Sequence, residues 1–136
     1  MRKSLVAAGA LATLLAGAAQ PKSEHHIRTF LVPQAGSTVH GVVNLTQRPH
    51  GGTLITVVAK GLRPDGAYLS LYYGNDHCEI EAYAEDDVLG SYTGNPSGVA
   101  VITARQGDDL DEIGSVSVRN ADDFSLLACA KVHAAP

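Results

Sequence analysis

The histidines are the side chains of this sequence best suited to bind a transition metal. There are six, and no two of them form a His-x-His pair. Imidazole nitrogens are good ligands for copper and zinc. His25 and His26 are adjacent near the start of the chain, and His133 lies close to its end. These three are candidates for a copper or zinc site at the surface, and the alternative is that they are solvated surface residues.

Two acidic runs could supply oxygen ligands to a hard cation. They are Glu85-Asp86-Asp87 and the run from Asp108 to Glu112. Calcium takes six to eight oxygen ligands in proteins, often from loops. Neither run has the ligand spacing and fixed glycine of an EF-hand loop. Asp108, Asp109 and Asp111 are therefore candidates for a cation site, and the alternative is a solvated turn whose charge favours solubility.

Tyrosines supply most of the aromatic side chains, five Tyr against two Phe and no Trp. Four of the five lie between positions 68 and 83. Tyrosine combines apolar area with a hydroxyl group, which suits a ligand-binding surface. Tyr68, Tyr72 and Tyr73 are candidates for such a patch. The alternative is that alternate tyrosines pack inside or against a β-sandwich.

The beginning of the chain has the features of an export signal. A short basic segment, Met1 to Ser4, precedes an apolar run from Leu5 to Leu15 and the small residues Ala16 to Ala19. This order is typical of a secretory signal peptide, predicted here as residues 1–19. The apolar run is too short to span a bilayer, and an uncleaved anchor is the alternative. We expect an extracytoplasmic protein, periplasmic or secreted.

Length and charge limit the remaining possibilities. The chain has 136 residues, 45% of them hydrophobic and 18% charged, which is enough for one modest domain. Removal of Arg2 and Lys3 with the signal leaves eight basic residues against 14 acidic ones, a formal net charge of −6. Nucleic-acid and anionic-membrane binders need a basic face, so this charge argues against both.

The elements that must position these candidates are β-strands. Short runs with period-two alternation and many β-branched residues are separated by turns rich in Gly, Pro, Asn and Asp. After a flexible arm at 20–26, a single domain at 27–133 is expected, a β-sandwich or small barrel. The predicted strands are 27–32, 38–46, 53–60, 67–73, 89–93, 99–103, 115–119 and 126–132.

Three blocks of this pattern resemble the copper/zinc superoxide dismutase family in their order and rough spacing. They are Gly36 to Leu45 with Val57 to Leu62, then Val88 to Ala100, and finally Ala121 to Asp123 with Ser125 to Cys129. The resemblance covers residues 27–132. It implies an eight-stranded Greek-key sandwich, or flattened barrel, whose first and last strands are neighbours. In that arrangement His26 and His133 could approach each other.

The resemblance also implies a disulfide bond between Cys78 and Cys129, the only cysteines. An oxidising compartment would allow the bond to form. The alternative is two separate buried thiols. A catalytic cysteine is not expected, because there is no Cys-x-x-Cys pair and the neighbouring Glu79 and Glu81 disfavour a thiolate.

The features that the family uses for chemistry are missing from the matching positions. Its His-x-His copper ligands fall on Leu69 and Leu71, and its later histidine falls at Val118 or Arg119. Residues 79–89, where the family has a zinc loop, contain no histidine. The arginine that guides anions corresponds to Leu126. The resemblance therefore implies the scaffold without the metal site.

These observations favour a non-catalytic module of the cell envelope, with a binding or structural role. We expect no cofactor, no nucleic-acid partner and no membrane span after signal cleavage, and the ligand would be an unidentified protein or small molecule. One alternative is a divergent superoxide dismutase or copper protein that uses relocated histidines with copper or zinc. Another is a cation-binding envelope protein that works through its acidic loops.

Overall fold

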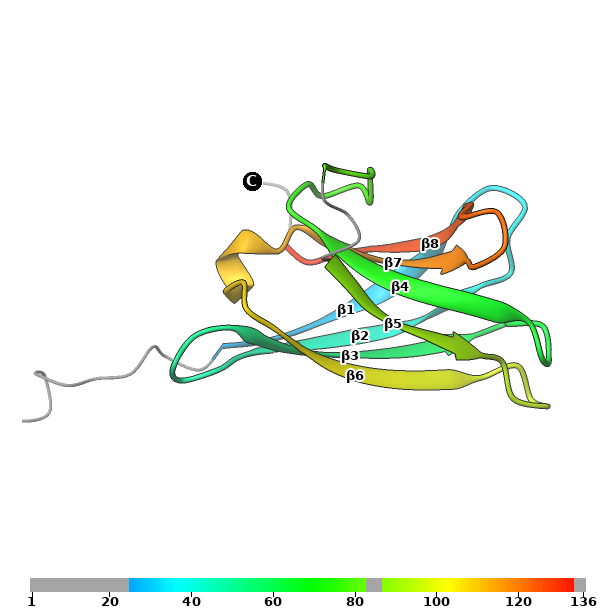
Figure 1. Ribbon diagram of the computed structural model, residues 1–136, viewed down its shortest axis with the longest axis horizontal. Coiled ribbons are helices and arrows are strands. Elements are labelled where there is room, and N and C mark those ends of the chain that lie inside the picture. The colour runs from blue at the N-terminus through cyan, green and yellow to red at the C-terminus, as the bar shows by residue number, and fades with distance from the viewer. Residues whose placement is uncertain (1–24, 83–86, 134–136) are drawn as a thin grey trace, which may run out of the picture.

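The computed structural model describes residues 25–82 and 87–133, which form an all-β domain of eight strands (Figure 1). The expected signal peptide and most of the expected arm lie outside the described residues. One turn of 3-10 helix, η2 (Leu110–Glu112), precedes β7. The strands are β1 (His26–Pro33), β2 (His40–Gln47), β3 (Thr53–Lys60), β4 (Ala67–Tyr73), β5 (Val88–Thr93), β6 (Ala100–Gln106), β7 (Ser115–Asn120) and β8 (Leu126–Lys131).

The eight strands form one antiparallel sheet in the order β5-β4-β7-β8-β1-β2-β3-β6. The sheet folds into two layers, with β1, β2, β3 and β6 in one and β4, β5, β7 and β8 in the other (Figure 1). β1 connects the layers, because it pairs with β2 over residues 26–31 and with β8 at Val32 and Pro33. The two end strands, β5 and β6, lie close together on the remaining side, so the barrel is nearly closed.

The main core lies between the layers and follows the predicted alternation. Ile55, Val57 and Ala59 of β3 are buried, whereas Thr56 and Val58 between them are only partly covered. The other layer contributes inward side chains from β7 and β8 to the same core. β-branched residues suit these positions because their side chains pack well on a pleated surface.

The predicted strands agree with the observed ones to within a few residues. The largest difference is at β6, which continues to Gln106 instead of ending at 103. The extension occurs because Arg105 and Gln106 pair with Leu54 and Thr53 at the start of β3. Likewise, β1 begins at His26, one residue inside the expected arm, because His26 pairs with Thr46. Within the described residues, no helix has the length and apolar composition needed to cross a membrane.

β4, like the neighbouring β7, is covered on both faces. Tyr68 and Tyr72 point into the main core, while Leu71 and Tyr73 belong to a second apolar cluster on the opposite side. We call this second group the outer cluster. It consists of Leu71, Tyr73 and Cys78, with Leu69, Val88, Leu126 and Cys129 packed against them.

Candidate functional site

The outer cluster occupies the place where the resemblance would put copper ligands. Leu69 and Leu71 stand at the two expected histidine positions of β4, and Leu71 is 0% exposed. A leucine side chain has no lone pair, so it cannot bind a metal. Val118 of β7 is also fully buried, in the main core. The residues at these positions therefore do not fit a copper site.

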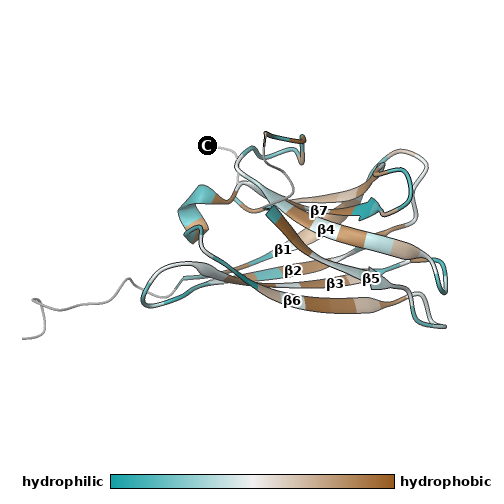
Figure 2. Cartoon of the chain, in the orientation of Figure 1, coloured by the Kyte–Doolittle hydropathy of each residue, from teal (hydrophilic) through white to brown (hydrophobic). Residues whose placement is uncertain are grey.

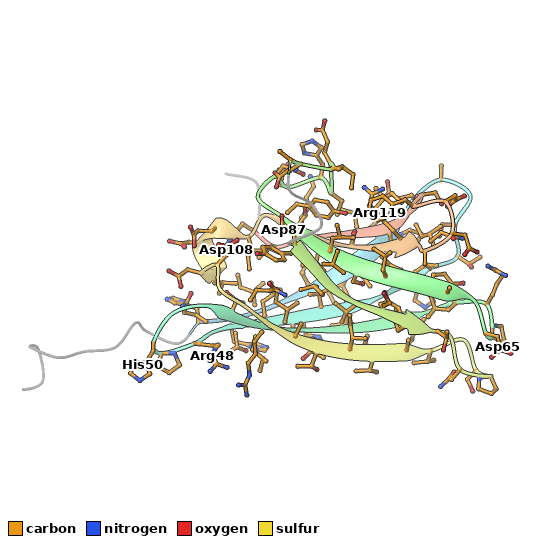
Figure 3. All side chains as sticks on the ribbon, in the orientation of Figure 1. Arg48, His50, Asp65, Asp87, Asp108 and Arg119 are labelled. Atoms are coloured by element: carbon orange, nitrogen blue, oxygen red, sulfur yellow. A yellow bond between two sulfur atoms is a disulfide. The ribbon has the colours of Figure 1, made fainter. Side chains whose placement is uncertain are left out.

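A buried arginine organises the outer cluster from β7 (Figure 3). Arg119 is 8% exposed and donates hydrogen bonds from Nε to the Tyr73 hydroxyl at 2.9 Å, from Nη1 to the Phe124 carbonyl at 2.8 Å, and from Nη2 to the Cys78 carbonyl at 2.8 Å. Its guanidinium also lies over the rings of Phe124 and Tyr73. The Tyr73 hydroxyl is 2.7 Å from Ser117 Oγ. The arginine thus joins β4 and β7 to the segments around Cys78 and Phe124.

Cys78 and Cys129 form a disulfide bond, with the two sulfur atoms 2.08 Å apart, which confirms the expected pairing. The bond ties the segment after β4 to β8. The Cys78 amide also donates to Ser115 Oγ, whose own hydroxyl donates to the Asn75 carbonyl. Both sulfur atoms are used in the bond, so neither is available as a nucleophile.

Arg119 was not expected from the sequence to have such a role. Its three acceptors lie 5, 41 and 46 residues away in sequence, and no local pattern indicates them. Gln47 is a second case: its Nε2 donates to Gly52 and Asp109, and its Oε1 accepts from the Leu110 amide. It thereby connects the β2–β3 hairpin with η2.

The candidate histidines do not form a metal site in the part of the chain that the structure describes. His26 Nδ1 lies 2.9 Å from Thr46 Oγ1, and His133 Nε2 lies 3.2 Å from the Leu110 carbonyl oxygen. Across residues 25–82 and 87–133, the group of three or more potential ligands that lie together contains none of the histidines. The candidate ligands His25, His26 and His133 are therefore not brought together among the described residues, and His26 and His133 each face other partners.

The carboxylates that do lie together differ from the expected set. Asp109, Asp111 and Glu112 have ligand atoms within 4.8 Å of one another. Asp108, which was expected to belong to the group, instead accepts a hydrogen bond from the Tyr72 hydroxyl at 2.8 Å. The Asp109 carboxylate accepts from the Gly52 amide at 2.8 Å, and Glu112 accepts from the Asp109 amide at 2.7 Å. The bonds that Asp109 accepts from Gly52 and Gln47 hold η2 against the β2–β3 hairpin.

His77 belongs to a cluster of charged side chains near the disulfide bond. His77 Nδ1 is 3.0 Å from Asp76 Oδ1, and His77 Nε2 is 2.7 Å from Glu79 Oε1. The hydrogen bonds to Asp76 and Glu79 raise the pKa of His77, and the bond to His77 lowers the pKa of Asp76. All three side chains are well exposed, so the arrangement fixes the orientation of a surface loop.

The three candidate tyrosines do not form a surface patch. Tyr68, Tyr72 and Tyr73 are 3%, 6% and 1% exposed. The Tyr68 hydroxyl accepts a hydrogen bond from the Arg63 amide at 2.8 Å, and the Tyr72 hydroxyl donates to Asp108. Burial, followed by the interaction with Asp108, raises the pKa of Tyr72. These side chains belong to the packed interior, because β4 is covered on both faces.

Tyr92 gives the fold a predicted weakness in alkali. Its hydroxyl is 2.6 Å from Ser70 Oγ, and burial raises its pKa from 10.0 to about 12. The folded state therefore favours neutral tyrosine. The contribution of Tyr92 to stability is fully present below pH 10 and is lost as the pH rises through 12. This happens because Tyr92 ionises at a lower pH in the unfolded chain than in the folded one.

The loss of stability from the ionisation of Tyr92 is at most roughly 3 kcal/mol, from the usual conversion of a pKa shift. It would be measured as the change in urea midpoint between pH 9 and pH 12 for the wild type and for Tyr92→Phe. The variant should lose less stability than the wild type over this range. Equal losses in the two proteins would contradict the assignment to Tyr92.

Leu71→His tests whether a histidine placed in the outer cluster can create a metal site. We expect the variant to lose about 2–4 kcal/mol of stability, because a polar ring replaces a fully buried leucine. We also expect it to bind no copper, since no second ligand is supplied. Ser91→His is a matched control at an exposed position of the neighbouring β5 and should cost less than about 0.5 kcal/mol. A stable Leu71→His variant that holds copper tightly would contradict this account of β4.

Comparison with known proteins does not identify the chain. No protein-family model matches it, and no curated protein sequence matches it.

Proposed function

We propose that the protein is a non-catalytic binding module built on a superoxide dismutase-like scaffold without a metal site. The observation that carries this proposal is the composition of the outer cluster. Leu71, Tyr73 and Arg119 pack together at the expected metal position, and each polar atom named there has a protein partner. The outer cluster therefore stabilises the fold. It contains neither metal ligands nor a free nucleophile with which a substrate could react.

The strand order supports the scaffold part of the proposal. The connections from β3 to β4 and from β6 to β7 pass between the layers and do not join hydrogen-bonded neighbours. Connections of this kind are typical of Greek-key proteins. The Cys78–Cys129 bond also agrees with the pairing that the resemblance implies. Both agree with a divergent member of that family.

The sequence of the first segment and the disulfide bond support an extracytoplasmic location. The segment 1–19 has the order of a secretory signal, and a disulfide bond is stable in an oxidising compartment. We infer a periplasmic or secreted protein of the cell envelope.

The two alternative functions, a copper protein with relocated histidines and a cation-binding protein, have less support. A relocated copper site would need histidines that converge, and His26 and His133 face other partners. A cation site at η2 would need free carboxylates, and those of Asp109 and Glu112 already accept hydrogen bonds from backbone amides.

An assay of superoxide consumption tests the proposal. The purified, oxidised protein is loaded with copper and zinc, dialysed and assayed with and without a chelator. We expect no chelator-sensitive rate above that of a protein-free dialysate. A chelator-sensitive rate that the triple variant His25→Ala, His26→Ala, His133→Ala abolishes would establish the relocated site and overturn the proposal.

A further inference from the structure

The solvent-facing side of β1, β2, β3 and β6 carries an apolar row across its full width. The register pairs Phe30 with Val42, Val42 with Val58, and Val58 with Val101, so the four side chains lie in one line on one face. Phe30 is 61% exposed and Val101 is 60% exposed at the two ends of the row. Figure 2 shows the apolar stretch in the middle of β6. Exposed apolar rows with polar surroundings are typical of interaction sites.

Basic side chains lie on both sides of this row. On one side of the row, the same face carries Arg28 on β1 and Arg105 on β6. On the opposite side of the row it carries His40 on β2 and Lys60 on β3, which stand opposite each other in the strand register. The Arg28 guanidinium lies 5.9 Å from the centre of the Phe30 ring. We call the apolar row with these flanking residues the basic face.

No Asp or Glu lies on β1, β2, β3 or β6. The described acidic residues lie instead in turns and in η2. The local charge of the basic face is therefore opposite to the net charge of the protein.

A groove of about 480 Å³ adjoins the basic face where β1 passes from one layer to the other. Its lining includes Phe30, Val32, Cys129, Lys131, Asp76 and His77. Asp76, the acidic residue of this lining, is paired with His77. His77 also lies 2.7 Å from Glu79, so the groove offers an apolar floor beside one further basic group, Lys131. A recess next to an exposed aromatic residue can accept an anchoring side chain from a partner.

We propose that the basic face and this groove bind an acidic polypeptide segment that also carries apolar side chains. This inference rests on the proposed function and names the class of its partner. An apolar centre with a charged rim is the usual composition of a protein–protein interface. Because the rim is basic, a partner of complementary charge must supply carboxylates.

Two other occupants fit the basic face less well. A second copy docked through the same face would bring the arginines and Lys60 of two chains together without counter-charges. A lipid surface would need several apolar side chains that project beyond their neighbours. Phe30 projects, but Val58 and Val101 have the same shape and size as the adjacent Thr56 and Thr103. The groove, in contrast, suits the single side chain of a polypeptide.

The test uses a synthetic helical peptide with leucines along one face and glutamates on both flanks of that face. It is titrated into isotopically labelled protein and followed by NMR. We expect resonance shifts at Phe30, Val58 and Val101. We also expect affinity to fall about tenfold or more in the double variant Arg28→Glu, Arg105→Glu, because opposite charges become like charges. Arg63→Glu makes one such charge reversal at an exposed position off this face and should bind as the wild type does, and the single variants Arg28→Glu and Arg105→Glu are compared with it.

Several results would overturn the inference. They are no binding at millimolar peptide, shifts confined to other surfaces, equal binding by the Arg28/Arg105 variant, or equal binding of a peptide with lysine in place of glutamate. Self-association through Phe30, or binding of phosphatidylglycerol vesicles without binding of the peptide, would assign the basic face to a different occupant. The superoxide assay is independent of this titration, so either proposal can fail while the other survives.

Discussion

Replacing Cys78 and Cys129 with alanine is expected to lower the free energy of unfolding by about 4 kcal/mol. The two residues are 51 positions apart, and a loop of that length loses this much conformational freedom in the unfolded chain when it is closed. The disulfide also holds the segment that covers Leu71 and Tyr73. Urea denaturation of the oxidised wild type and of the double alanine variant measures the difference.

A reduced sample of the wild type is the control for this experiment. Reduction breaks the same bond without removing side-chain atoms, so it should produce most of the loss seen in the alanine variant. A loss below about 1 kcal/mol in both samples would mean that the bond does not hold the outer cluster in place.

Arg119→Met is the second substitution with a large expected effect, a loss of roughly 2–4 kcal/mol. Methionine has a similar length but no donors, so the buried carbonyl group of Cys78 and the part-buried carbonyl group of Phe124 lose their hydrogen bonds. Arg119→Lys should not restore full stability, because an ammonium group cannot match the planar arrangement of donors. Thermal and urea unfolding of these variants would measure the effect.

Arg105→Met provides the matched control for Arg119. Arg105 is an exposed arginine on β6, and its replacement should change stability by less than about 0.5 kcal/mol. If Arg119→Met were as stable as this control, the hydrogen bonds to the Cys78 and Phe124 carbonyl groups would contribute nothing to the fold.

The strands could be predicted because their signal is local. Alternation along β3 identifies Ile55, Val57 and Ala59 as inward residues, and turn residues mark both ends of the strand. The disulfide pairing followed from the resemblance. Arg119 could not be identified in this way, since its partners come from β4, from the segment after β4 and from the turn before β8.

The candidate sites were harder to predict than the fold. Tyr72 and Tyr73 point to opposite sides of β4, and the sequence does not reveal that both sides are covered. Asp108 and Asp109 are adjacent, yet one faces Tyr72 and the other faces Gly52. Which of two neighbouring carboxylates joins a cluster is decided by the tertiary structure.

The basic face shows why net charge is a weak guide to partners. The acidic residues that the structure describes lie in turns and η2, whereas Arg28, Lys60 and Arg105 share one face of the sheet. Strand alternation assigns residues to a face within one strand. Only the register between strands shows that Phe30, Val42, Val58 and Val101 form a continuous row.

Native mass spectrometry tests the central proposal most directly, namely that the outer cluster does not hold a metal ion. The oxidised protein is loaded with copper and zinc, dialysed and weighed intact, so that retained metal ions are counted for each chain. We predict that neither metal is retained in stoichiometric amount. One tightly held copper ion per chain would contradict the claim, and separate substitution of His26, His77 and His133 would then identify its ligands.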